Sequence, residues 1–418
     1  MIVHGPYPVG EPRVTREARA ALLGGWSVDV VACTRAGEAR EEVVEGVNVI
    51  RLPITHRRGV GFIATAREYF AFAILAATRV TRRHVRRRYD VIQVHNPPDF
   101  LVYAALLPRL MGARLVFDIH DLSPDMFAMR FGGGRVVRTA DRVLRAIERH
   151  ACAVADSIVT VHEPYRRELV TRGVPGDKIS VVMNVVDQSR LPSMRASLQR
   201  DKRIIYHGTV TPHYGVELLC EAFGHIALEV PDATLEIYGE GDALDGIRGH
   251  VEKLGLNDRV RLSGSYIPHR EILEAVAGAA VGVVPNLPTR LNRFALSSKL
   301  FEFIALGVPV VSADLETIRA HFSDSEVRFF AAGDAAELAA ALRDVLGNPN
   351  ESRARAGRAR DRYERDYSWP LQARRYLDLL DTLTQTPAET KDDETRRRGT
   401  IRRDDASRAA PGLGDDIA

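Results

Sequence analysis

The chain has 418 residues, enough for two or three domains, and its net charge of +3 is too small to predict nucleic-acid binding. Cys33, Cys152 and Cys220 are scattered without a CxxC pair, which argues against a disulfide framework or a cysteine-based zinc site and fits a reducing cytosol. The first residues show no leader pattern, and the longest strongly apolar run, 69–77, is far shorter than the ~20 residues that span a bilayer. We therefore expect a cytoplasmic protein.

Short β-branched runs alternate with longer helical patterns from the first residues onward. In the first half, the runs predicted to be strands are 2–5, 27–33, 47–52, 90–95, 113–120, 156–162 and 178–182. Nearly continuous apolar strands separated by helices are typical of parallel sheets that are covered on both faces. The pattern predicts a doubly wound domain over residues 1–187.

The alternation lapses after this domain and then starts again. Residues 188–200 are polar with one proline and are predicted to be a linker. The strands predicted beyond it are 203–208, 233–239, 259–264, 281–285, 308–313 and 327–330, within a second domain over 201–366. Two sheets fit this pattern better than one very large sheet. The predicted fold class is therefore α/β, with two doubly wound Rossmann-like domains facing across a cleft, where such sheets bind ligands.

The C-terminal part divides into a helix and a tail. Leu377, Leu380 and Leu383 recur at helical spacing, which predicts a helix over 367–385 that crosses back to the N-terminal domain. Residues 386–418 have no aromatic side chain and few large aliphatic ones. Such a composition cannot bury enough surface to offset its ordering entropy, so we predict a disordered tail.

The segment SSKLFEFIALGVPVV, residues 297–311, places two charged residues at the start of an apolar helix. Ser297 or Ser298 is a suitable N-cap, so the free N–H groups of the first turn lie at the carboxyl end of the preceding strand. These N–H groups and Lys299 can bind an anion, and Glu302 can accept hydrogen bonds from sugar hydroxyls. An exposed ion pair between Lys299 and Glu302 explains the same spacing, and the residues alone do not decide between the two interpretations.

Together with other segments in the same order, this motif resembles the retaining, nucleotide-sugar-dependent glycosyltransferases of family 4, which have the two-Rossmann (GT-B) architecture. The other segments are 10–23, 94–99, 118–127, 155–169, 179–187, 207–223 and 235–272. The resemblance implies sugar transfer from a nucleoside diphosphate sugar to a glycan, a lipid-linked acceptor or a small molecule, with retention of the anomeric configuration. It also implies that no metal or other cofactor is needed, which fits the lack of a DxD motif after a strand.

The resemblance assigns roles to individual residues. It implies that His120 and Lys299 are catalytic, with His120 near the reacting sugar and Lys299 beside the leaving diphosphate. The implied donor-binding residues are Gly208, Thr209, His213, Gly239, Ile267, Arg293, Ser297, Ser298, Lys299, Leu300 and Glu302. The implied acceptor-binding residues are Arg13, Asn96 and Asp121. Alternatively, His120 and Asp121 only cap the end of a strand by bonding loop amides. For Arg13, the alternative is a solvated residue on the surface.

Two places depart from the family pattern. The family often has an acidic residue eight positions before its ribose-binding Glu, where this chain has Phe294. It also often has an Arg and a Lys in the loop after the first strand of the second domain, where Thr209 and Tyr214 stand here. We expect Lys299 to supply the missing charge. The expected helpers are His213, Arg290 and Arg293.

The departures keep two other classes of function open. One is another enzyme of the same architecture, such as a sugar-nucleotide epimerase or a phosphorylase, although the order of the motifs suits neither. The other is a nucleotide-sugar-binding homologue without catalysis, which the missing loop cations favour. Fold alone does not separate these classes.

The segment Arg57–Arg88 contains nine arginines and one acid, Glu68, together with an aromatic-rich helical pattern. A basic amphipathic element can lie on anionic lipid, so we expect peripheral contact with the inner face of the membrane. A helix packed on the first sheet, with a solvated basic end, fits the same residues.

Overall fold

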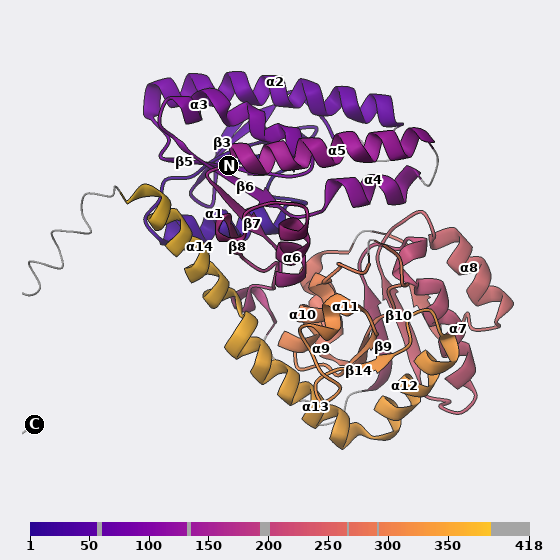
Figure 1. Cartoon of the computed structure of the whole chain (residues 1–418). Helices are drawn as coiled ribbons and strands as arrows, with labels where there is room; N and C mark the ends of the chain where they lie inside the picture. The colour runs from indigo at the N-terminus through magenta and orange to yellow at the C-terminus, as the bar shows by residue number, and fades with distance from the viewer. Residues whose placement is uncertain (57–60, 132–134, 193–200, 266, 291, 386–418) are drawn as a thin grey trace, which may run out of the picture.

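A computed structural model describes residues 1–56, 61–131, 135–192, 201–265, 267–290 and 292–385 and shows two α/β domains (Figure 1). The predicted tail and most of the predicted linker lie outside the described residues. Each domain is built on its own sheet, which confirms the predicted fold class.

The N-terminal sheet has eight strands in the order β3-β4-β2-β1-β5-β6-β7-β8. The strands are β1 (Ile2–Pro6), β2 (Asp29–Cys33), β3 (Glu41–Val44), β4 (Val47–Leu52), β5 (Val91–His95), β6 (Arg114–Ile119), β7 (Ser157–Thr160) and β8 (Ile179–Val181). All neighbours are parallel except β3, which pairs antiparallel with β4. The sequence patterns missed β3 because its residues, EEVV, lie at the sheet edge with little buried surface.

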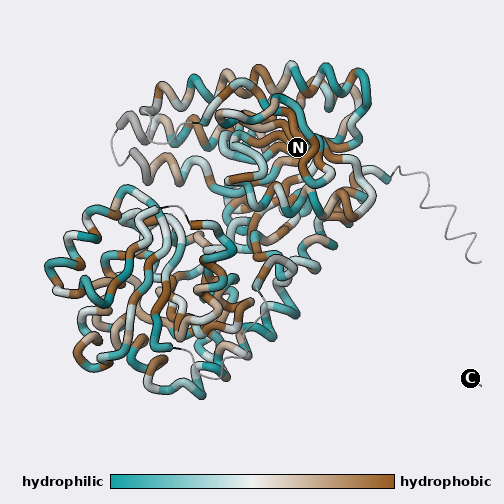
Figure 2. The backbone as a smooth tube through the Cα atoms, turned by 180° about the vertical axis from the view of Figure 1, so that it is seen from behind, coloured by the Kyte–Doolittle hydropathy of each residue, from teal (hydrophilic) through white to brown (hydrophobic). Residues whose placement is uncertain are grey.

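Helices cover this sheet on both faces. They are α1 (Pro12–Leu23), α2 (Phe62–Arg87), α3 (Leu106–Leu110), α4 (Ser123–Phe131), α5 (Arg135–Val154) and α6 (Glu163–Thr171), with short 3-10 turns η1 (Asp99–Ala105), η2 (Gly176–Lys178) and η3 (Gln188–Arg190). Figure 2 shows brown, apolar strands in the interior of this domain and more polar segments outside them. Among the described residues, no helix combines the length and the apolar character that crossing a membrane requires.

The C-terminal sheet has six parallel strands in the order β11-β10-β9-β12-β13-β14. The strands are β9 (Asp201–His207), β10 (Thr234–Tyr238), β11 (Val260–Leu262), β12 (Ala279–Val284), β13 (Val310–Ala313) and β14 (Arg328–Phe330). The helices are η4 (Pro212–Tyr214), α7 (Val216–Ala227), α8 (Leu244–Lys253), α9 (His269–Ala277), α10 (Ser298–Ala305), α11 (Glu316–Arg319), α12 (Ala335–Gly347) and α13 (Pro349–Arg362), followed by the π-helical turn η5 (Tyr363–Tyr367).

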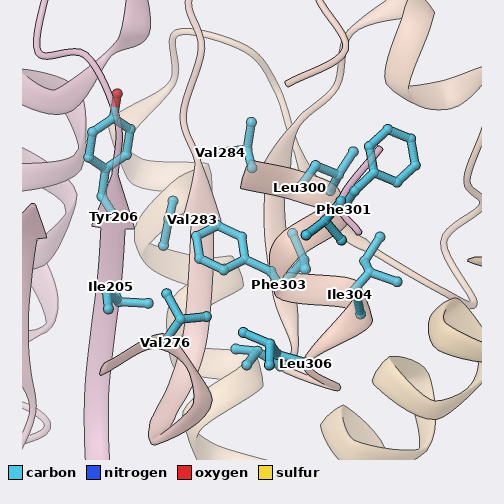
Figure 3. Packing of buried hydrophobic residues seen from close by; sticks show 14 of the residues in the cluster. Ile205, Tyr206, Val276, Val283, Val284, Leu300, Phe301, Phe303, Ile304 and Leu306 are labelled. Atoms are coloured by element: carbon cyan, nitrogen blue, oxygen red, sulfur yellow. The ribbon is translucent and has the colours of Figure 1, made fainter. Parts of the chain in front are cut away.

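Apolar side chains fix the position of α10 against this sheet. Leu300, Phe301, Phe303 and Ile304 are all buried, and Figure 3 shows the Phe303 ring beside Val283 of β12. A Cβ atom on Gly282 would lie 2.5 Å from the ring of Phe303, so the glycine in β12 makes room for that ring. The direction of α10, and therefore of its first turn, is set by this packing.

The last helix, α14 (Trp369–Thr384), runs back along the N-terminal domain (Figure 1). The Tyr376 hydroxyl donates a hydrogen bond of 2.6 Å to Oε1 of Gln93 in β5. The main-chain N–H of Met183 donates to Oε1 of Gln372 at 3.0 Å. Because α14 follows the C-terminal domain in the chain, these buried contacts tie the two domains together.

Candidate functional site

The first turn of α10 carries two charged side chains into the protein interior. Lys299 and Glu302 are each only 6% exposed, so the alternative of a surface ion pair does not hold. Both reach the carboxyl end of β9, where Tyr206 and His207 are the last residues of the strand. Two buried opposite charges beside one strand end form a polar site within an otherwise apolar region.

Lys299 is surrounded by aromatic rings. Its Nζ atom donates a hydrogen bond of 3.1 Å to the Tyr206 hydroxyl and lies 4.2 Å from the ring centroid of Tyr206 and 4.8 Å from that of Tyr214. Burial lowers the pKa of Lys299 to about 7, against the opposing effect of Glu302. The ammonium group has no carboxylate at hydrogen-bonding distance among the described residues. An anion that enters this site would therefore restore the charged form of Lys299.

Glu302 lies between two imidazole rings. Its Oε2 atom is 3.2 Å from Nε2 of His207, and its Oε1 atom is 3.3 Å from Nε2 of His269. Burial alone would raise the pKa of Glu302, but His207 and His269 hold this pKa below its usual value. Oε2 of Glu302 makes no hydrogen bond of good geometry within the described part of the chain. The carboxylate can therefore still accept hydrogen bonds from hydroxyl groups of a ligand.

The main chain comes close to this site at two glycines. Gly208 follows β9 with φ +121°, and a Cβ atom there would lie 3.2 Å from Nζ of Lys299. Gly239 follows β10 with φ +156°, and its Cβ atom would lie 1.9 Å from the carbonyl oxygen of Gly208. Only glycine fits these two places without strain, and at Gly208 the missing side chain leaves space beside the ammonium of Lys299.

The next loop contributes Thr209 and His213. Thr209 is exposed, and its carbonyl oxygen accepts a hydrogen bond of 2.7 Å from the Tyr206 hydroxyl. His213 is half-buried, and burial together with the nearby charge of Lys299 lowers its pKa, although Asp242 opposes this. Both predicted donor residues therefore lie next to Lys299.

The other predicted donor residues differ in their surroundings. Ser297 caps α10 without a side-chain hydrogen bond, Ser298 is exposed, and Ile267 is half-buried shortly before α9. The Leu300 side chain is fully buried in the core, so only its main chain can reach a ligand.

The two arginines expected to help Lys299 are held elsewhere. Arg293 is exposed and pairs with Glu316 at 2.8 Å. Arg290 pairs at 2.7 Å with Asp125 of the N-terminal domain. Each would have to leave an acidic partner to reach a diphosphate, so this part of the expectation is not supported by the geometry.

On the N-terminal side, His120 follows β6 at the end that faces the second domain. Its Nε2 atom lies 3.0 Å from Nδ1 of His95 and 3.5 Å from Oδ2 of Asp118. Burial lowers the pKa of His95 to about 4, which makes this ring neutral at neutral pH. Burial alone would raise the pKa of Asp118, but Arg13 and His120 hold it well below its usual value. His120 is therefore oriented by a neutral ring and a carboxylate.

Two of the predicted acceptor residues have structural partners instead. The Arg13 guanidinium is buried, donates two hydrogen bonds to Asp118 at 3.0 and 3.1 Å, and donates a third to the carbonyl of Val182 at 2.7 Å. Arg13 is thus neither an evident acceptor contact nor a solvated surface residue. The Asn96 side chain shapes the loop after β6, where its Oδ1 accepts the N–H of His120 at 2.7 Å.

Asp121, the third predicted acceptor residue, is half-buried at the domain boundary. Burial raises its pKa, although His120 acts in the opposite direction. Its charge in turn raises the pKa of Tyr214 in the C-terminal domain, after the larger effect of burial. Asp121 therefore lies near Tyr214, whose ring is one of the two beside Lys299.

Direct contacts join the two halves of the site. Nε2 of His162 is 2.8 Å from the main-chain carbonyl oxygen of Phe294, the residue that replaces the family's acidic position. Arg16 of α1 acts on Glu302 electrostatically, and burial lowers the pKa of Arg16 to about 10.

Sequence reasoning gave no role to several of these residues. His95 ends the predicted strand 90–95, and Asp118 lies two residues before the end of the predicted strand 113–120, at the sheet edge where ligands bind. No motif singles out Arg16 or Tyr376 within its helix, and only the packing of the helices places them near the site.

Two family models match the chain. Residues 10–184 match a glycosyl transferase 4-like domain, and residues 201–348 match the glycosyl transferases group 1 model. Glycogen synthase of Mycobacterium tuberculosis is 27% identical over 343 residues, with 80% of each chain covered. Phosphatidyl-myo-inositol mannosyltransferase of Mycobacterium leprae is 25% identical over 324 residues, covering 77% of this chain and 80% of that protein.

Solved structures share the fold. Sucrose-phosphate synthase from Thermosynechococcus elongatus superposes with a TM-score of 0.71 at 20% identity, covering 91% of this chain and 95% of that chain. HepE of Anabaena, solved in complex with UDP and glucose, gives a TM-score of 0.68 at 15% identity, covering 92% and 98%. At these identities the similarity shows the architecture alone.

Proposed function

The chain belongs to the GT-B glycosyltransferases of family 4, and we propose that it moves a sugar from a nucleoside diphosphate sugar to a glycan or lipid acceptor with retention of configuration. The observation that carries this proposal is the pair Lys299 and Glu302, both buried and both at the end of β9. A cation and a hydroxyl acceptor one helical turn apart suit a diphosphate and the ribose joined to it.

In the proposed complex, the diphosphate lies between Lys299, the first turn of α10 and the main chain at Gly208. Negative charge grows on the leaving diphosphate as the bond to the sugar breaks. A lysine already positioned there stabilises the transition state more than the bound donor. We propose that the leaving phosphate oxygen takes the proton of the acceptor hydroxyl, and that this step uses no metal.

His120 is proposed to contact the donor sugar from the N-terminal side. The neutral His95 ring and the Asp118 carboxylate hold the imidazole in place, as the distances of 3.0 and 3.5 Å support. Asp121 is proposed to contact the acceptor. Arg13 contributes indirectly to the position of His120, because it keeps the Asp118 carboxylate beside that ring ionised.

The acceptor class is proposed from the relatives, since one is a glycogen synthase and another a phosphatidyl-myo-inositol mannosyltransferase. A surface of α2 and α3 favours the lipid-linked alternative. Phe70, Ile74, Leu107 and Leu110 are exposed there, and the exposed arginines at the end of α2 are Arg82, Arg86 and Arg87, followed by Arg88 at the C-cap. Apolar side chains beside cations suit a peripheral contact with anionic lipid.

A donor screen tests the proposal. Thermal shifts with UDP, GDP and ADP identify the base, and release of nucleoside diphosphate from the corresponding sugar donors then measures turnover. We expect stabilisation by one nucleotide and slow hydrolysis of its sugar donor. Stabilisation without hydrolysis or transfer for any donor would favour the non-catalytic homologue.

A further inference from the structure

Three side chains of the N-terminal domain converge at a point that the proposed transfer reaction does not use. His4 lies in β1, His56 follows β4, and Glu68 lies on α2. Oε1 of Glu68 is 3.1 Å from Nε2 of His4 and 2.8 Å from Nδ1 of His56. The atoms that these residues offer as ligands all lie within 4.8 Å of one another.

The surroundings of this cluster exclude most of the solvent. The side chain of His4 is 1% exposed and that of Glu68 is 12% exposed. The rings of Tyr69 and Phe72 meet the His4 ring edge-on, with centroid distances of 4.5 and 5.0 Å. Nε2 of His4 makes no hydrogen bond of good geometry with the described residues, although it is buried and near Glu68. A buried nitrogen in this state points to a bound group between it and the carboxylate.

We propose that His4, His56 and Glu68 bind a divalent transition metal ion such as Zn²⁺. Two imidazole nitrogens and one carboxylate oxygen are a common zinc donor set that leaves the fourth position of a tetrahedral ion open. With bonds of ~2.0–2.1 Å, neighbouring ligand atoms of such an ion lie about 3.3 Å apart. The two nitrogen–oxygen distances of this cluster, 3.1 and 2.8 Å, are close to that value, and the two nitrogens lie within 4.8 Å of each other.

The cluster lies on the face of the N-terminal sheet that α2 covers, because Glu68 belongs to α2 and the Phe72 ring of this helix packs on His4. Asp118 lies on the opposite face, where it binds Arg13 of α1. The proposed ion is therefore separate from the transfer site, and metal binding does not rest on the proposed function.

A metal titration of the full chain tests the site. The protein is stripped with a chelator, then titrated with Zn²⁺ against a chromophoric competitor, and separately with Co²⁺ while the visible spectrum is recorded. We expect one ion per chain and the intense Co²⁺ absorption of four-coordinate geometry. Glu68→Gln and His56→Gln should each weaken zinc binding by ~10-fold or more.

His250→Gln is the matched control, because it removes the histidine of another His–Glu pair, in which Nδ1 of His250 is 3.7 Å from Glu217. It should bind zinc as the wild type does. His120→Ala tests the other group of potential ligands, His95, Asp118 and His120. Zinc binding that is lost in His120→Ala and kept in Glu68→Gln would place the ion there and overturn the proposal.

A wild-type chain that binds no zinc would also overturn it, because the cluster would then be a hydrogen-bonded group only. Melting temperatures recorded without metal show whether the Glu68 and His56 variants are folded. Nucleoside diphosphate binding is measured on the same samples. Zinc binding without nucleotide binding would support the metal site and contradict the proposed transferase site.

Discussion

The Nδ1 atom of His95 lies 3.0 Å from the Nε2 atom of His120, although the two residues belong to the ends of different strands. The same Nδ1 atom is 3.2 Å from Oδ2 of Asp118, which also accepts a hydrogen bond of 2.9 Å from Gln93. Gln93 in turn accepts the Tyr376 hydroxyl at 2.6 Å. A continuous buried network therefore joins the C-terminal helix α14 to His120.

This network predicts that His120 acts on the reacting sugar from a fixed orientation. We expect His120→Ala to lower turnover by about 10- to 100-fold, the equivalent of one lost charge-assisted hydrogen bond, while nucleoside diphosphate binding changes little. Steady-state kinetics and calorimetry measure the two effects. His150→Ala, which removes an exposed histidine, is the control. Equal loss of binding and turnover would place His120 at the nucleotide instead.

Glu302→Ala should weaken nucleoside diphosphate binding by about 1.5–3 kcal/mol, because a ribose hydroxyl pair loses a charged acceptor. Calorimetry with the nucleotide identified by the donor screen measures the change. Glu229→Ala removes an exposed acid that pairs with Arg343, away from the site, and should leave binding unchanged. Wild-type affinity in Glu302→Ala would rule out the ribose contact.

Lys299→Ala should lower turnover by ~10²-fold or more, with a much smaller effect on donor binding, because its charge matters most when the diphosphate leaves. Lys299→Arg should restore only part of the rate, since a planar guanidinium fits the aromatic surroundings of Nζ differently. Lys202→Ala, at an exposed ion pair with Asp232, is the control. A wild-type rate in Lys299→Ala would mean that another group neutralises the diphosphate.

The pKa of Lys299, lowered to about 7 by burial, predicts that nucleotide binding takes up a proton. A bound diphosphate raises this pKa, so between the free and bound values the complex holds more protons than the free protein. Affinity should therefore fall as pH rises above 7, and the fall should be absent in Lys299→Ala. Calorimetry at pH 8 in buffers of different ionisation enthalpy measures the proton uptake. Proton release, or no exchange, would contradict the assignment.

The basic end of α2 predicts binding to anionic vesicles. Arg83 pairs with Asp29 and Glu41, so it has a structural role, and the lipid contact is expected from arginines that are exposed. Replacing Arg82, Arg86 and Arg87 by Gln should abolish co-sedimentation with acidic vesicles, and added salt should weaken it in the wild type. The same change at Arg261, Arg270 and Arg358, which are exposed in the C-terminal domain, should have no effect. Equal sedimentation with neutral vesicles would disprove the electrostatic contact.

Local sequence determined the two-sheet architecture of this protein and the first turn of α10. Apolar β-branched runs favour buried strands, so the predicted strands all have counterparts, and among the strands of the described residues only the exposed edge strand β3 was missed. Lys299 and Glu302 could be found because capping and i, i+3 spacing act within one helical turn.

Tertiary structure decided which charged groups are partners. Arg13 and Asp118 are 105 residues apart in the chain, and only the packing of α1 against the sheet brings them within 3.0 Å. His4, His56 and Glu68 likewise come from a strand, a loop and a helix and have no motif in common. Electrostatic and coordination contacts depend on distances in space and leave no periodic pattern in the sequence. These partners could therefore be identified only from the tertiary structure, in which hydrophobic packing fixes the positions of the elements.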